Sequence, residues 1–141
     1  MKAKRWLLAS LAVLVVLGVV GFVVHHVLLA DMYKDTASIW RPAAEMGRLM
    51  GVFWIGNIIY ALMFTFIYTK GYEKKKKNST KSNVEQGLRY GVYISLLTCV
   101  PMSFGWYALL PIPGMLAVYW AIAGVVESAA AGVAVGLVYK A

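Results

Sequence analysis

The chain has 141 residues, of which 61% are hydrophobic and only 14% are charged. This composition leaves too little polar surface for a soluble domain and no room for a soluble catalytic domain beside the apolar segments. The net charge of +8 lies mostly in segments that flank those apolar runs, so it does not indicate a nucleic-acid-binding protein.

Four apolar runs are each long enough to cross a bilayer, which takes about 20 helical residues. They cover residues 6–29, 49–68, 90–110 and 115–139. In lipid every backbone polar group must be paired within the structure, and a β-barrel would show alternation instead of continuous apolar runs. The sequence therefore predicts an all-α fold, with residues 1–141 forming a single four-helix membrane domain.

The first run, 6–29, follows a short basic segment that contains Lys2, Lys4 and Arg5. Its apolar length exceeds the roughly 7–15 residues of a secretory signal. We therefore expect an uncleaved anchor helix.

Two adjacent histidines, His25 and His26, lie near the end of this run. Neighbouring residues on a helix point about 100° apart, so the pair cannot hold one haem or one metal ion between them. Either could join Asp31 or Glu45 in a metal or redox site, but a histidine that packs or contacts lipid headgroups is the expected case.

The first loop, 30–48, carries charges of both signs beside Tyr33 and Trp40, as expected of a segment at the membrane interface. Pro42 suits the first residue of a helix, and Glu45 follows near the positive helix end. We expect the second helix to begin outside the membrane near Pro42.

The second loop, 69–88, is polar, low in complexity and rich in lysine, with four adjacent lysines at 74–77. Such a segment is typical of a hydrated, mobile linker. Its lysines could attract anionic lipid headgroups, but a signal for membrane orientation is the simpler interpretation.

Basic residues are distributed unevenly between the two sides of the predicted bundle. One side, which carries both termini and the second loop, holds 11 of the 14. The other side holds only Lys34, Arg41 and Arg48. The positive-inside rule thus predicts that both termini are cytoplasmic, most simply in a bacterial inner membrane.

Pro101 interrupts the third run, where it removes a backbone hydrogen bond to the carbonyl of Leu97 and predicts a kink. The lone cysteine, Cys99, is expected to be buried and unreactive. The segment 110–114 contains two prolines and a glycine, so we expect a tight turn that makes the third and fourth helices an antiparallel hairpin.

Small residues recur every four positions in the fourth run, at Gly124, Ser128, Gly132 and Gly136. They form one stripe along a helix, against which another helix can pack closely. Packing within one chain is the expected use, and contact with a second copy or another subunit is the alternative.

Glu127 is the one charged residue in the fourth run, and an acid in hydrocarbon requires a partner. Asn57, Ser95, Thr98 and Cys99 lie at a comparable depth in the second and third runs. We expect a neutral acid that donates a hydrogen bond to one of them, either as a structural contact or as a proton or cation site.

The segments 21–33 and 87–91, followed by a glycine-rich last run, resemble small bacterial four-helix membrane proteins classed as domains of unknown function. The resemblance implies architecture only.

Three hypotheses for function remain open. The first is a non-enzymatic protein that acts by helix association, as an accessory subunit or a homo-oligomer, with lipids and a protein or a second copy as partners. The second is a small proton or cation transporter that uses Glu127. The third is a redox or metal-binding protein that uses His25 and His26. No sequence motif for catalysis is evident, and no cofactor is predicted.

Overall fold

The computed structural model describes residues 3–71 and 80–139, which contain helices and no strand. The elements in chain order are α1 (Ala3–Phe22), the π-helix η1 (Val23–Leu28), α2 (Ala30–Asp35), the 3-10 helix η2 (Ala37–Ile39), α3 (Ala43–Gly71), α4 (Thr80–Leu97), α5 (Cys99–Leu109) and α6 (Gly114–Val138). The all-α prediction is confirmed for this part of the chain.

Within residues 3–71 and 80–139, four helical segments are long and apolar enough to span a membrane. They are Ala3–Leu28, Ala43–Gly71, Ser82–Leu109 and Gly114–Val138. The chain thus has the architecture of a multi-pass membrane protein, as its composition predicted.

The second loop is shorter than the predicted range 69–88. α3 continues to Gly71 and α4 begins at Thr80, so the predicted loop extends too far into the helix on each side. Hydropathy marks only the apolar part of a helix, whereas polar residues can extend it beyond the membrane. The lysines at 74–77 lie outside the residues that the structure describes.

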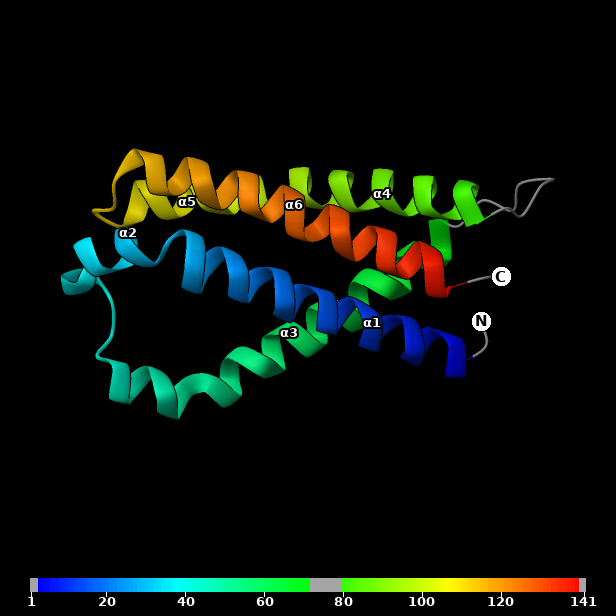
Figure 1. Ribbon diagram of the computed structural model, residues 1–141, viewed down its shortest axis with the longest axis horizontal. Helices are drawn as coiled ribbons and strands as arrows, with labels where there is room; N and C mark the ends of the chain where they lie inside the picture. The colour runs from blue at the N-terminus through cyan, green and yellow to red at the C-terminus, as the bar shows by residue number, and fades with distance from the viewer. Residues whose placement is uncertain (1–2, 72–79, 140–141) are drawn as a thin grey trace.

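α4 and α5 follow one another end to end and α6 runs beside both in Figure 1, and these helices form the most closely packed part of the molecule. A Cβ atom added to Gly87 would lie 2.0 Å from the carbonyl oxygen of Gly132, and one added to Gly91 would lie 2.0 Å from that of Ser128. Glycine therefore brings the two backbones together where any side chain would clash.

The predicted kink is a break between α4 and α5 at Thr98, three residues before Pro101. Pro101 has no N–H to donate to Leu97, so the regular helical pattern fails there. Residues 110–113 then connect α5 to α6, with the amide of Ile112 donating to the carbonyl of Leu110 at 2.8 Å.

α1 lies against both α6 and α3 and completes an apolar core near the start of α1 and the end of α6. Ala9, Val13, Phe64, Tyr68 and Val135 are all at most 2% exposed. Farther along α1, Trp54 of α3 lies against Gly18, within 3.6 Å of a Cβ built there.

α3 diverges from the other helices toward its N-terminal end, at the end of the molecule that contains α2 (Figure 1). From Ala43 to Ile59 every residue except Asn57 is exposed. One half of this span is therefore packed in the bundle, and the other half is largely exposed, although its Trp54 reaches Gly18 of α1.

Candidate functional site

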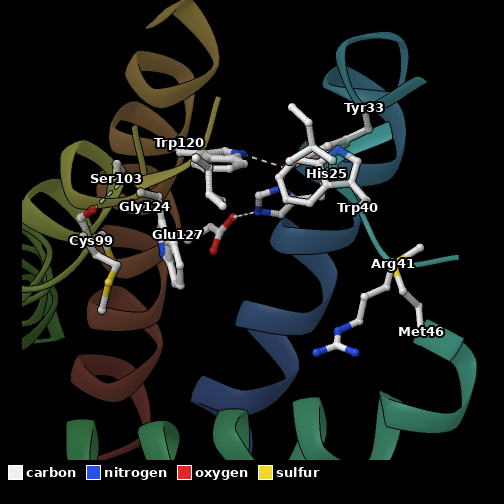
Figure 2. Close-up of a pocket in the computed structure, with 14 residues that line it drawn as sticks. His25, Tyr33, Trp40, Arg41, Met46, Cys99, Ser103, Trp120, Gly124 and Glu127 are labelled. Carbon is white, nitrogen blue, oxygen red and sulfur yellow. Dashed lines mark hydrogen bonds and ion pairs between the residues drawn. The ribbon is translucent and has the colours of Figure 1, made fainter. Parts of the chain in front are cut away.

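Glu127 of α6 faces His25 of η1, and their side chains approach between the two helices (Figure 2). Glu127 Oε1 lies 3.5 Å from His25 Nε2, and the two side chains are 19% and 38% exposed. Oε1 itself is buried and has no hydrogen-bond partner among the described residues. The two atoms are therefore at an ion-pair distance without hydrogen-bond alignment, and the buried Oε1 is an acceptor without a donor among the described residues.

Gly21 lies beside the carboxylate of Glu127. A Cβ atom at this position would lie 3.8 Å from Glu127 Oε1. Gly21 and His25 are four residues apart, so both lie on the side of the first span that faces α6.

The π-helix η1 fixes the direction of His25. The amide of Leu29 donates to the carbonyl of Val24, five residues earlier, at 2.9 Å. The neighbouring His26 stacks on Phe22 instead, with ring centroids 4.9 Å apart. Single π turns inside α-helices occur frequently at functional sites, and this one carries both histidines.

A chain of hydrogen bonds continues from His25 into α2. His25 Nδ1 lies 2.7 Å from the Tyr33 hydroxyl, and Trp120 Nε1 donates to that same hydroxyl at 2.7 Å. Because an indole can only donate, the Tyr33 hydroxyl accepts from Trp120 and has its own hydrogen available for Nδ1. In a neutral imidazole this arrangement leaves the hydrogen on Nε2, which faces Glu127.

Tyr33 is held in its neutral form. Burial raises the pKa of its hydroxyl, the negative charge of Glu127 adds to this effect, and the hydrogen bond from Trp120 lowers the pKa in part. Tyr33 therefore keeps its hydroxyl hydrogen throughout the neutral pH range and can donate it to Nδ1 of a neutral His25.

Aromatic rings surround one end of this chain of hydrogen bonds. Tyr33, Trp40 and Trp120 contact one another with ring centroids 5.7–6.4 Å apart. Trp40 is also fixed at its edge, because its Nε1 donates to Thr36 Oγ1 at 2.9 Å. These contacts hold the rings in defined positions beside Glu127.

The Glu127–His25 pair lies on the wall of an open cavity of about 800 Å³, which we call the Glu127 cavity. Figure 2 shows the residues that surround it. Its lining is His25, Tyr33, Ile39, Trp40, Arg41, Met46, Cys99, Met102, Ser103, Trp106, Leu110, Trp120, Gly124 and Glu127. The cavity is thus bounded by η1, α2, η2, α3, α5 and α6 together with their connections.

Cys99 lies half-buried on this cavity wall, in contrast to the predicted fully buried position. The break between α4 and α5 places Cys99 at the start of a new helix beside Gly124. A Cβ atom at Gly124 would lie 2.4 Å from that of Cys99, so this glycine is required for the close approach.

The polar partners predicted for Glu127 bond to their own helices instead. Asn57 donates to the carbonyl of Phe53, Ser95 to that of Val92, and Thr98 to that of Ile94 at 2.8–2.9 Å. Asparagine, serine and threonine side chains commonly satisfy themselves in this way.

These residues also differ in their exposure to solvent, since Ser95 is buried and Thr98 is exposed. The partner that the structure gives to Glu127 is His25, which the sequence predicts to pack or to contact lipid headgroups, with a metal site as the alternative.

The residues considered for a metal site are not brought together. Asp31 pairs with Lys34 at 2.9 Å, and Glu45 pairs with Arg41, while His26 stacks on Phe22. Within residues 3–71 and 80–139 no group of three His, Cys, Asp or Glu side chains could hold a metal ion. The structure therefore offers no support for the metal or redox hypothesis there.

The small-residue stripe of α6 lies against α4 and α5 of the same chain. Added Cβ atoms at Gly132 and Gly136 would lie 2.1 and 2.3 Å from the carbonyl oxygens of Gly87 and Asn83. Ser128 is 2% exposed, with its Oγ 3.4 Å from the Tyr60 hydroxyl. The stripe is occupied within the monomer and is not available to a second chain.

Comparisons with protein-family models, curated proteins and solved structures gave no match to this chain. The resemblance noted in the sequence therefore stays a prediction about architecture, and function has to be argued from the site.

Proposed function

We propose that this chain is a small membrane transport protein in which Glu127 and His25 hold an exchangeable proton or cation. The observation that carries the proposal is the buried Oε1 of Glu127, which lacks a hydrogen-bond partner in the described structure and lies 3.5 Å from an imidazole on an open cavity.

Burial makes this pair sensitive to its charge state. An ionised carboxylate within a membrane span is costly unless a positive group or a proton neutralises it. His25 can supply that charge, because histidine is the side chain that ordinarily gains and loses a proton near neutral pH. The cavity gives solvent and solutes a route to the same carboxylate.

Hydrogen bonds connect the pair to α2 outside the spans. The sequence of groups is Glu127, His25, Tyr33 and Trp120, with two bonds of 2.7 Å. Since Tyr33 can both accept and donate, it can orient His25 while the imidazole changes its protonation state.

The distribution of basic residues supports an orientation for the site. The positive-inside rule assigns both termini and the lysine-rich segment to the cytoplasm of a bacterial inner membrane, with α2 on the outer side. The Glu127 cavity, whose lining includes Tyr33 of α2, would then open to the outside.

Proton flux in proteoliposomes tests this proposal. A pH gradient should drive proton movement through the wild type, and the Glu127→Gln variant should abolish it while retaining its helical circular dichroism. Glu85→Gln is a matched control, because Glu85 is an exposed acid of α4. Equal flux through the Glu127→Gln variant and the wild type would refute the proposal.

Association with a second copy is the other candidate function, and α3 is the helix that favours it. Gly47 and Gly51 lie four residues apart on the exposed half of this helix, and a Cβ atom at either would meet nothing within 4 Å. Small residues at this spacing let membrane helices pack closely. The candidate surface for a second copy is therefore on α3, whereas the sequence offered the α6 stripe only as the alternative to packing within one chain.

Oligomeric state in mild detergent tests this second function. A dimer that Gly51→Leu dissociates, but that Gly105→Leu leaves intact, would support it. Gly105 is a suitable control because it is also open, but on α5. A monomeric wild type would rule out self-association.

A further inference from the structure

The Glu127 cavity is larger than a proton site needs. At about 800 Å³ it falls in the range of pockets that hold organic molecules, roughly 300–1,000 Å³. A metal ion would instead require several converging ligands, and the described residues provide no such group. Size and lining together indicate an organic ligand.

Aromatic side chains dominate the lining beside the acid. Tyr33, Trp40 and Trp120 meet at interplanar angles of 29°, 59° and 75°, so their faces and edges form a corner instead of a flat stack. Trp106 adds a fourth ring and is 44% exposed. Aromatic faces attract cations through the ring quadrupole, and tryptophan does so best.

The edges of two of these indoles are already bonded. Trp120 donates to Tyr33 and Trp40 donates to Thr36, at 2.7 and 2.9 Å. The rings are thus held in place before a ligand arrives, and binding does not have to order them. The aromatic rings present a polarisable surface to a ligand, and the thioether of Met102 extends this surface.

The charge of the cavity depends on the Glu127–His25 pair. Arg41 also reaches the lining, but its guanidinium is paired with Glu45. Tyr33 and Cys99 also line the cavity, and phenol and thiol side chains ordinarily carry no charge near pH 7. With His25 neutral, the uncompensated charge is the carboxylate of Glu127.

From these observations we propose that the Glu127 cavity binds a monovalent organic ammonium ion with apolar substituents, in exchange for one proton. Glu127 neutralises the ammonium, and the tryptophan faces cover its substituents. This inference rests on the proposed function, because it names the class of cation that the transport site accepts.

The exchange balances in charge and atoms. Before binding, the pair carries one dissociable proton, either on the His25 imidazolium beside the Glu127 carboxylate or on the acid itself. The ammonium takes the place of that proton beside the carboxylate, and the proton leaves to solvent. No covalent bond to carbon forms or breaks.

Binding of benzyltrimethylammonium to the full-length protein in phosphatidylglycerol nanodiscs tests the inference, with tryptophan fluorescence and calorimetry as readouts. We expect saturable binding. The affinity should fall by up to about tenfold for each unit by which the pH is lowered once the Glu127–His25 pair takes up its proton, because one proton competes with one cation. At a pH where the Glu127–His25 pair carries its proton, a pH indicator should record about one proton released for each cation bound. Neopentylbenzene, the neutral carbon analogue, should bind at least tenfold more weakly.

Two pairs of variants separate the cavity from the membrane surface. Glu127→Gln should lose binding at least twentyfold, whereas the exposed Glu85→Gln should not change it. Trp106→Leu should weaken binding at least threefold while Trp54→Leu leaves it unchanged, since Trp54 is also 44% exposed but lies outside the cavity. Unfolding midpoints within a few degrees of the wild type ensure that the variants are folded.

The ammonium could belong to a dissolved solute or to a lipid headgroup. Adding phosphatidylethanolamine to the nanodiscs distinguishes the two, because a headgroup ligand would compete with benzyltrimethylammonium and a solute site would be unaffected. Either result is consistent with an ammonium ligand and shows whether the ammonium comes from a lipid headgroup or from a dissolved solute.

Absence of Glu127-dependent binding, or equal binding of the neutral analogue, would overturn the inference. If proton flux through the wild type still depends on Glu127, the proposed function survives and only the ligand class is wrong. If the ammonium binds but no flux of proton or cation is found, the ligand class stands and transport is wrong.

Discussion

Contact between α4 and α6 is the clearest place to test the packing quantitatively. Gly91→Ala would put a Cβ atom 2.0 Å from the carbonyl oxygen of Ser128 and 3.0 Å from Ala129 Cα, whereas ordinary van der Waals contact begins at 3.4 Å. Both atoms are backbone, so neither can move away by changing a side-chain rotamer. The two helices would have to separate along their shared interface.

The expected loss of stability follows from two opposing effects. Overpacking a close interface costs about 3 kcal/mol, and replacing a helical glycine by alanine returns about 1 kcal/mol through helix propensity. We therefore expect a net loss of about 2 kcal/mol for Gly91→Ala. Gly105→Ala is the control, because a Cβ atom there meets nothing within 4 Å; it should be neutral or stabilising by up to about 1 kcal/mol.

Unfolding in mixed micelles with increasing sodium dodecyl sulfate, followed by circular dichroism, measures the difference. The Gly91→Ala transition should move to a lower detergent fraction than that of the wild type, and the Gly105→Ala transition should not. Coincident transitions of Gly91→Ala and wild type would show that the two helices do not pack as closely as described.

Three further predictions concern the site. His25→Asn should remove the response of proton flux to pH between about 5 and 8 while leaving the fold intact, because the imidazole provides that response; an unchanged pH profile in flux measurements would argue against a role for His25. Tyr33 has a folded-state pKa above its unfolded value, so its contribution to stability is present below about pH 10 and is lost as pH rises through the folded pKa; thermal unfolding should show this alkaline loss reduced in Tyr33→Phe, and identical pH profiles would contradict it. Gly21→Leu should push α1 away from Glu127 and lower ammonium binding at least fivefold in calorimetry, whereas Gly56→Leu, at an open position, should not.

The broad architecture could be predicted because it depends on local properties of the sequence. Apolar run length alone located the four spans, and Pro101 marked the region where the third span breaks into α4 and α5. Helix ends were less predictable, since α3 and α4 continue into polar sequence that no hydropathy rule assigns to a helix.

The partner of Glu127 could not be predicted from depth alone. Depth along a helix places Glu127 near Thr98 and Asn57, but contact also requires that the two side chains face each other. The π-helix adds one residue to a turn and so rotates everything after it by about 100° relative to an unbroken α-helix. The composition of Val23–Leu28 does not predict this extra residue in the turn.

The sequence does carry one signal for this contact. Gly21 and His25 are four residues apart in the first run, so a side-chain-free position and an ionisable residue share one face of the helix. That pairing marks a side of α1 where another helix can approach and present a polar group. The match between this face and Glu127 required the three-dimensional arrangement.

Infrared difference spectroscopy of the carboxyl stretch across pH tests the account most directly. Between about pH 4 and 9 the wild type should show a protonation change that disappears in Glu127→Gln, shifts in His25→Asn and is suppressed by saturating benzyltrimethylammonium. A carboxyl spectrum that is identical in the wild type and Glu127→Gln throughout this range would show that Glu127 does not exchange its proton, and would contradict the account.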